Sequence, residues 1–584
     1  MSNKKPTHIF SKLTKYNFVI YFFALAILIL GRLLRGGYIL TFDMVFAPGM
    51  HPAKEPGLFT IHEYLISFFA QIIPADILQK IILLIIFTTI GSGMFLLSKK
   101  LFKNTFVGLI SGTIYLLNPF VYERFLAGNW QFLVGYAMLP IFIYFLIDFY
   151  YKDYSNKIFL IILAIWGFAS VMSQHHFLLF GVVFASATFL KLVKEIYIKK
   201  ELHKLSKTAV FSLFISLLFI AALYIYSKNL EFAENQLLFF AASTNRDFGV
   251  VENLLYLSGF WAQPSLFDHF FENSILLKLL WTAFLLCAIM GAGFVMFKNL
   301  IPFFRKVNKN IFDGFPKLKL NKEYNSILIL ILLIGILGYG LSLGLNGTVG
   351  KIYSFFFTDI PLLRGMREPQ KFLSLFALSY SILIGFFFVS LKNFFVMIEK
   401  EFKFKEKNRI ILNRSLGILI LIIFLAGGIP LLNAANSQLS ITTYPDSFIE
   451  FNEILENSDD PKILILPWNA YFDFNWNERR IVDPSPIYFD AEVISQNPKD
   501  IIGMEKICDI EFTTEIRIEN SPNYQACFNY SDDPELFIKT FKLLEFDYIL
   551  LHNSFNAPSA EQLLDMNHLE QIIDSKEIRV YRVK

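Results

Sequence analysis

The sequence predicts a mainly helical bundle that crosses a membrane many times and ends in a small α/β domain. Hydrophobic residues make up 55% of the 584 residues and the mean hydropathy is +0.49, whereas ordinary soluble proteins have about 45–50% apolar residues. The apolar residues fall in separate runs with Lys/Arg clusters between them, while residues 433–584 are polar and acidic. We therefore expect a transmembrane domain at 1–432 and a second domain at 433–584.

Eleven runs come near the length of about 20 apolar residues that a spanning helix needs. They are 17–34, 79–98, 105–118, 131–150, 158–173, 177–190, 208–226, 275–297, 326–345, 372–391 and 415–432. Residues 158–190 are assigned two crossings, and not one long helix, because basic residues flank this stretch at both ends. Residues 174–176 then form the turn between the two helices.

Basic residues also set the expected orientation, because they favour the cytoplasmic side. The N-terminal segment and the even-numbered connections between spans hold about 29 Lys/Arg, and the opposite loops hold about 11. We therefore expect a cytoplasmic N-terminus and an exocytoplasmic C-terminal domain in the cell membrane. No small-residue cleavage site follows Leu34, which favours an uncleaved first span over a signal peptide.

The C-terminal domain is expected to be a small α/β unit. Strand-like runs lie at 462–467, 547–552 and 577–583, and helix-like patterns lie at 447–457 and 534–546. Its net charge of −15, against +19 for the remainder, argues against a nucleic-acid partner. Cys508 and Cys527 would pair in an oxidising compartment or stay as thiols, and the sequence leaves both alternatives open.

The first outer loop, residues 35–75, contains Asp43 among apolar neighbours. Such surroundings raise the proton affinity of a carboxylate, so Asp43 is a candidate general base. The alternative is that it caps the loop or pairs with Arg32 or Arg35. Residues 58–74 are nearly apolar but too polar in the middle for a span, which favours an interfacial helix.

The second outer loop, residues 118–131, contains the adjacent pair Glu123 and Arg124. Neighbours on a helix point about 100° apart, so the two side chains can serve different partners. Tyr122 and Trp130 fit either anchors in the aromatic belt of the membrane or faces on which a sugar stacks.

Two further outer segments contain polar residues. His175 and His176 occupy the third outer turn, where they would bind substrate or Asp43 by hydrogen bonds, or only cap a tight hairpin. Adjacent histidines are a weak metal signal. The loop at 227–273 is also outside, and nothing in its spacing specifies chemistry.

The most informative motif, residues 363–372, lies directly before the tenth span. Glu368 and Pro369 suit the start of a helix, whose N-terminus has unpaired N–H groups and a partial positive charge. Arg364, Arg367 and Lys371 lie on the side where basic residues are disfavoured. The motif therefore predicts a phosphate site. The alternative is that the basic side chains snorkel to lipid headgroups.

These stretches resemble the GT-C glycosyltransferases, which use polyprenyl-phosphate-linked sugars on the outer face of the membrane. The similarity is greatest to the membrane region of the cell-wall alpha-(1->3)-arabinofuranosyltransferases. It rests on Asp43, on residues 118–124 with 128–130, and on the motif at 366–371. It covers about the first 430 residues in topology and only these stretches in sequence. Those enzymes are much longer and have large carbohydrate-binding additions, which this chain's small tail does not match.

The resemblance implies an inverting glycosyl transfer in which Asp43 is the base. Met44 and Val45 follow it, so the paired carboxylates of some members are missing, and neither a metal nor another cofactor is predicted. The motifs described above supply the other candidate residues, which would bind the substrate and the lipid phosphate: Arg364, Arg367, Glu368, Lys371, Glu123, Arg124, His175 and His176. The expected partners are a polyprenyl-phosphate-linked sugar donor, a glycan, glycolipid or protein acceptor, and membrane lipids.

Two rival functions belong to other classes. A transporter or flippase of lipid-linked saccharides would need polar residues through the spans down to the inner face, and few are present. A non-catalytic envelope assembly factor would use its tail to bind a partner. The cytoplasmic loops contain no glycine-rich phosphate loop, which argues against an ATP-driven pump.

Overall fold

The computed structural model divides into two compact units. The first contains residues up to Gly31 together with Leu83–Gln438, and the second contains Arg32–Ile82 together with Leu439–Lys584. The structure describes residues 17–52, 61–151, 156–193, 241–243, 248–262, 266–272, 274–307, 322–346, 350–359, 366–401, 406–467, 471–495, 546–554, 561, 564 and 568–584.

The first unit is helical. Its helices up to residue 193 are α1 (Asn17–Leu30), α3 (Ala75–Phe102, of which the part from Leu83 belongs here), α4 (Thr105–Leu116), α5 (Pro119–Leu126), α6 (Trp130–Tyr151), α7 (Asn156–Met172) and α8 (His175–Val193). Its later helices are α11 (Val250–Leu255), α13 (Ile275–Val307), α14 (Lys322–Ser342), α15 (Gly350–Asp359), η7 (Pro369–Phe372), α16 (Leu373–Glu401), α17 (Glu406–Gly427), η8 (Ile429–Leu431) and α18 (Leu432–Ser437).

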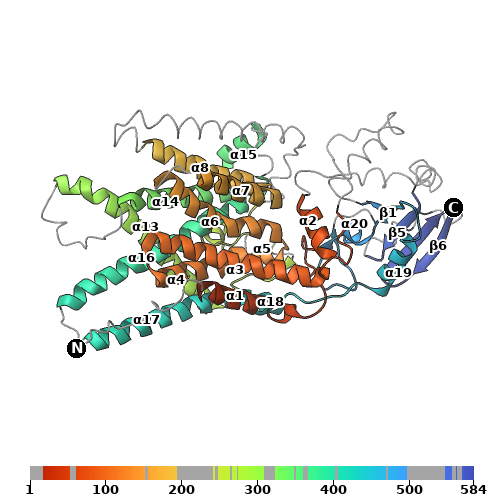
Figure 1. Ribbon diagram of the computed structural model, residues 1–584, viewed down its shortest axis with the longest axis horizontal. Helices are drawn as coiled ribbons and strands as arrows, with labels where there is room; N and C mark the ends of the chain where they lie inside the picture. Colours follow the sequence, from red (N-terminus) through yellow and green to blue (C-terminus); the bar gives the residue numbers. More distant parts are fainter. Residues whose placement is uncertain are drawn as a thin grey trace. The chain divides into compact units, whose positions relative to one another are not determined.

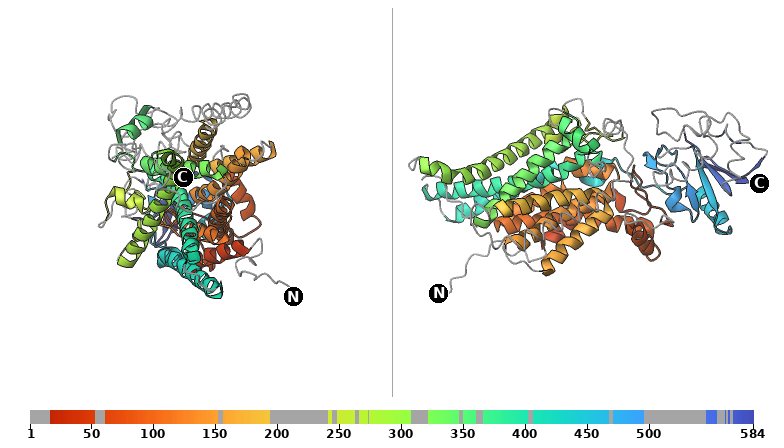
Figure 2. Two further views of the ribbon diagram at one scale, coloured as in Figure 1. Left: turned by 90° about the vertical axis from the view of Figure 1, so that its left-hand side faces the viewer. Right: turned by 90° about the horizontal axis from the view of Figure 1, so that it is seen from above.

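Long helices of this unit run side by side in both Figure 1 and the right-hand view of Figure 2. Helix α16 packs against α4, α13 and α14, and α6 packs against α7 and α8. The approach of α13 to α16 is close, since a Cβ placed on Gly291 would lie 2.1 Å from the carbonyl oxygen of Leu383.

The helices confirm a polytopic membrane bundle. Eight helical stretches of the described residues are long and apolar enough to cross a membrane, or nine if the pair Ser415–Gly427 and Ile429–Ser437, bent by 53°, is one span. Residues 158–190 form two helices, α7 and α8, as expected. Helix α7 is shorter than the other spans. The expected span at 208–226 lies outside the described residues.

The second unit is built on a five-stranded mixed sheet with the order β4-β1-β5-β7-β6. Strands β4, β1 and β5 are parallel, and β7 is antiparallel to both β5 and β6. Its elements are η2 (Gly31–Leu34, whose Gly31 belongs to the first unit), α2 (Ile61–Ala70), α19 (Asp446–Leu455), β1 (Lys462–Leu466), β2 (Tyr471–Phe472), β3 (Ile481–Val482), α20 (Ser485–Tyr488), β4 (Glu492–Ile494), β5 (Tyr548–His552), β6 (Leu569–Asp574) and β7 (Ile578–Val583).

The expected strands at 462–467, 547–552 and 577–583 are confirmed as β1, β5 and β7, and the expected helix at 447–457 is α19. The expected helix at 534–546, except for Phe546, and the pair Cys508 and Cys527 lie outside the described residues. Strand β6 was not predicted.

The second unit also contains residues 32–82, which the sequence had placed in the transmembrane domain. Backbone bonds explain this grouping: Tyr38 N–H donates to Thr442 O (2.8 Å) and Phe42 N–H donates to Arg480 O (2.9 Å). Leu40 and Val45 lie in the same hydrophobic core as the strands β1 and β5. The C-terminal boundary, after Gln438, is close to the expected one at 433.

Candidate active site

Two adjacent residues, Asn118 and Pro119, separate the end of α4 from the start of α5. Pro119 lacks the N–H that would continue α4, and it suits the first turn of α5. The Asn118 side chain accepts a hydrogen bond from Val121 N–H (3.0 Å) and donates to the carbonyls of Ile114 (3.0 Å) and Tyr115 (2.7 Å). One buried amide therefore caps both helices and fixes the direction of α5.

Arg124 of α5 is only 1% exposed. Its Nη1 donates to Asn129 Oδ1 (2.8 Å) and forms an ion pair with Glu368 Oε2 (3.2 Å). Its Nη2 has no hydrogen-bond partner among the described residues. A buried guanidinium N–H without a partner costs free energy, so an acceptor that reached this nitrogen would remove that cost.

Three phenyl rings surround the Arg124 guanidinium. Its Cζ lies 4.8 Å from the ring centre of Phe260 and 5.5 Å from those of Phe120 and Phe132. All three rings are buried. Aromatic faces attract a cation and keep water away from it, which strengthens its interaction with an anion.

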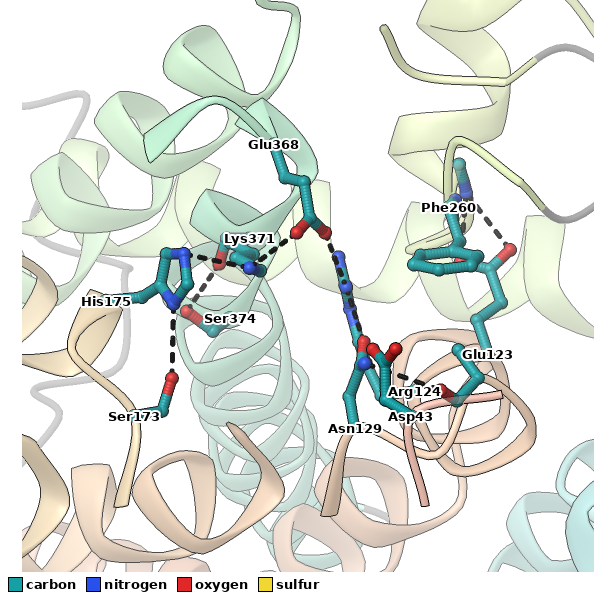
Figure 3. A network of polar contacts seen from close by, with 12 residues as sticks. Asp43, Glu123, Arg124, Asn129, Ser173, His175, Phe260, Glu368, Lys371 and Ser374 are labelled. Carbon is teal, nitrogen blue, oxygen red and sulfur yellow. Dashed lines mark hydrogen bonds and ion pairs between the residues drawn. The ribbon is translucent and has the colours of Figure 1, made fainter. Parts of the chain in front are cut away.

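Glu368 joins Arg124 to a second cation, Lys371, whose Nζ lies 2.6 Å from Glu368 Oε1 (Figure 3). Lys371 Nζ also donates to His175 Nε2 (2.9 Å). An ammonium can only donate, so Nε2 is unprotonated and His175 Nδ1–H donates to Ser173 Oγ (3.2 Å). Burial alone would raise the pKa of Glu368, but Lys371 and Arg124 hold that pKa well below its usual value.

The segment that contains Glu368 is held by its neighbours. Tyr353 of α15 donates to Met366 O (2.6 Å), and a Cβ on Gly344 would lie 2.6 Å from Pro369. The predicted helix start is observed, because Pro369 opens the 3-10 turn η7, which leads into α16. The Gln370 side chain is buried, and neither its oxygen nor its nitrogen has a partner within the described part of the chain.

The two histidines of the predicted pair lie in different surroundings. His175 joins the polar cluster, whereas His176 is 1% exposed and packs on Phe132, with ring centres 4.4 Å apart. Gly135 leaves room for it, since a Cβ there would lie 2.3 Å from the His176 ring. Neither ring nitrogen of His176 has a partner in the described residues.

Glu123 points to another segment. Its carboxylate accepts hydrogen bonds from the backbone N–H groups of Gly259 and Phe260, each at 3.1 Å, and from the Ser258 hydroxyl. Glu123 and Arg124 therefore serve different partners, as their adjacent positions on a helix predict.

Asp43 belongs to the second unit and lies in a tight turn. Thr41 and Met44 exchange backbone hydrogen bonds of 3.1 and 2.8 Å around it. The Tyr471 hydroxyl donates to Asp43 Oδ1 (2.7 Å), and the Tyr471 ring stacks on Phe42 at 4.3 Å. Arg32, one of the expected alternative partners, donates to the Leu439 carbonyl at 2.8 Å.

The structure thus brings Arg124, Glu368, Lys371 and His175 together from three distant stretches. Arg367 is exposed in the same motif, and Arg364 lies outside the described residues. Among the residues that are described, no three His, Cys, Asp or Glu side chains gather to hold a metal.

The similarity to solved structures extends over nearly the whole chain. A cryo-EM structure of the arabinofuranosyltransferase AftD from Mycobacteria superposes with a TM-score of 0.52 at 11% identity, over 97% of this chain and 40% of that one. The two chains share the same fold. This chain therefore spans less than half the length of AftD.

A crystal structure of the oligosaccharyltransferase of Archaeoglobus fulgidus in the apo form gives a TM-score of 0.46 at 12% identity, over 95% of this chain and 71% of that one. No protein-family profile and no curated protein matches the sequence.

Several residues of this cluster were not predicted from the sequence. Asn129, Phe132 and Phe260 contact Arg124, and Ser173 holds His175. The sequence gives no signal for the apolar contacts, since phenylalanine accounts for 67 residues of the chain. Asn129 lies in the stretch 128–130 on which the resemblance rests, but no role was predicted for its side chain.

Proposed function

We propose that this chain is a membrane glycosyltransferase that transfers a sugar from a polyprenyl-phosphate donor to a glycan, glycolipid or protein acceptor on the outer face. The observation that favours this most is Arg124, a buried arginine with a nitrogen that lacks a partner in the described residues, set in a cluster of charged groups. The GT-C fold supports the same class of reaction.

In the proposed reaction, the acceptor hydroxyl attacks the anomeric carbon from the face opposite the phosphate and gives its proton to the Asp43 carboxylate. The new C–O bond forms as the bond to the phosphate oxygen breaks, which inverts the anomeric centre and releases polyprenyl phosphate. Arg124 Nη2, Lys371 and Arg367 stabilise the charge that develops on this phosphate. Glu368 pairs with both buried cations and orients them.

The role of each group can be tested with the purified protein in lipid nanodiscs. The probes are short-chain polyprenyl-phosphoryl arabinofuranose, mannose, glucose and galactose, and the readout is release of polyprenyl phosphate. We expect Asp43→Asn to lower turnover by about 10³-fold, because it removes the base. Arg124→Lys should lower it by about 10²-fold, because an ammonium cannot replace the guanidinium fork.

Asp473→Asn is the matched control for Asp43→Asn. Asp473 is an exposed carboxylate of the same unit that pairs with Arg480, and its loss should leave turnover within about twofold. Full activity of Asp43→Asn would reject the base assignment. Failure of the wild-type protein to consume any donor in the panel, or movement of intact donor across a vesicle, would reject the transferase and favour the transporter.

A further inference from the structure

We propose that Glu123 is a positioning residue, which docks residues 258–260 on α5 so that Phe260 covers the guanidinium of Arg124. This inference deepens the proposed function and rests on it. The sequence had suggested that Glu123 contacts the substrate directly. We instead assign it an indirect role, which it exerts through Phe260 and Arg124.

The Glu123 carboxylate is already occupied. Oε1 accepts from Ser258 Oγ and Gly259 N–H, and Oε2 accepts from the N–H groups of Gly259 and Phe260. The side chain is 2% exposed. A sugar hydroxyl would have to displace one of these bonds to a buried charge, and such bonds are stronger than bonds between neutral groups.

The backbone of this segment is shaped to bind a carboxylate. Gly259 has a φ of +134°, a conformation that other residues rarely adopt, and it brings consecutive N–H groups to the same side chain. A Cβ there would also lie 3.0 Å from the Leu254 side chain. The backbone conformation therefore favours glycine here, and a side chain would also require Leu254 to shift.

A second set of hydrogen bonds, centred on His269, also holds residues 258–260. His269 Nδ1 accepts from Phe271 N–H (3.2 Å), so its Nε2 bears the proton and donates to Asn253 Oδ1 (3.0 Å). Ser258 Oγ lies 3.2 Å from the same Nε2. Asn253 Nδ2 donates to Ser243 O (3.0 Å). The segment is thus fixed between this network and Glu123.

The position of Glu123 beside Arg124 links the docking to the site. One residue of α5 holds the segment, and the next extends its guanidinium under the Phe260 ring of that segment, 4.8 Å away. If Glu123 released the segment, Phe260 would lose its anchoring bond and water would reach Arg124. An anion would then bind a hydrated guanidinium, which attracts it less strongly.

Two variants and their combination test this coupling by release of polyprenyl phosphate from the donors of the panel above. We expect Glu123→Gln and Phe260→Ala each to lower kcat/KM at least tenfold, mainly through kcat, because Arg124 acts on the developing charge. The double variant should be no worse than the worse single variant, because both changes remove one interaction. Additive losses would overturn the proposal.

Tyr339→Phe is the matched control for the loss of one anchoring bond. It removes the bond from the Tyr339 hydroxyl of α14 to Val251 O (3.2 Å), which anchors α11 and not residues 258–260. We expect kcat/KM to stay within about twofold. An equal loss in Tyr339→Phe would mean that Glu123 contributes only to general loop stability.

Amide hydrogen exchange tests the docking without any substrate. In the wild-type protein the amides of Gly259 and Phe260 should be protected, and in Glu123→Gln they should exchange at least tenfold faster, since a glutamine amide cannot accept at both positions. Unchanged protection would overturn the docking. The protection could be lost in Glu123→Gln while the wild-type protein turns over no donor. That result would refute the proposed transfer reaction and leave the docking intact.

Discussion

Glu368 is a single carboxylate shared by two cations, and each of its oxygens has its own partner. Oε2 pairs with Arg124 and Oε1 with Lys371, so removal of Glu368 leaves two positive charges buried together. Breaking a buried ion pair in this way is strongly destabilising, by about 3–5 kcal/mol. The carboxylate therefore has a structural role in addition to any role in transfer.

The lowered pKa of Glu368 predicts a pH dependence of stability. A carboxyl whose pKa is lower in the folded protein contributes stability that is fully present above the unfolded value of about 4.3 and is lost as pH falls toward the folded value. We expect the thermal unfolding midpoint in detergent to fall progressively as the pH is lowered below about 5. The Glu368→Gln variant, with a lower midpoint throughout, should show a smaller decrease. Parallel curves for the two proteins would contradict this.

At this scale the sequence indicated several charged residues that the structure brings together, but it did not indicate their apolar contacts. Arg124, Glu368, Lys371 and His175 were all selected because an ionisable group near a membrane is costly. Phe260 was not, because phenylalanine is common in this chain and an aromatic ring gives no sequence signal of the cation on which it packs.

Elements were predictable where local chemistry decides them. Pro119 and Asn118 set the boundary between α4 and α5, and the long apolar runs gave the membrane-length helices. The two-residue strands β2 and β3 were not predictable, since their pairing depends on distant contacts. The docked segment at 258–260 was missed for the same reason.

The contact between α13 and α16 depends on one glycine. We expect Gly291→Ala to lower the free energy of unfolding by about 1–3 kcal/mol, because its methyl group would collide with the backbone of Leu383. Gly293→Ala, two residues along the same helix, meets no atom within 4 Å. It should be neutral or stabilising, by up to about 1 kcal/mol, since alanine favours the helix.

Thermal unfolding in detergent compares the two variants directly. If Gly291→Ala and Gly293→Ala had equal midpoints, the contact of α13 with α16 would not depend on the missing side chain.

For the whole molecule, composition predicted two parts but not which residues belong to each. The change in charge near residue 433 lies close to the boundary at Gln438. The membership of residues 32–82 in the second unit was hidden, because only three-dimensional pairing, such as that of Tyr38 with Thr442, reveals it. No local sequence pattern around Tyr38 or Thr442 predicts that these residues pair.

We propose that the C-terminal domain is exocytoplasmic, as the distribution of basic residues favours. In a variant whose Cys287, Cys508 and Cys527 are replaced by serine, the exposed Lys576→Cys should react with a membrane-impermeant maleimide in intact cells. Lys99→Cys, at the end of α3 on the expected cytoplasmic side, should react only after lysis. The reverse pattern would invert the topology and place the proposed chemistry on the inner face.

The pairing of an early loop with late strands also sets the order in which the protein matures during translation. Phe42 exchanges backbone hydrogen bonds with Arg480 and Val482, so the ribosome must synthesise more than 400 intervening residues before that loop finds its partners. The second unit is thus completed last, and a nascent chain stalled before residue 480 exposes an unpaired edge to chaperones and proteases.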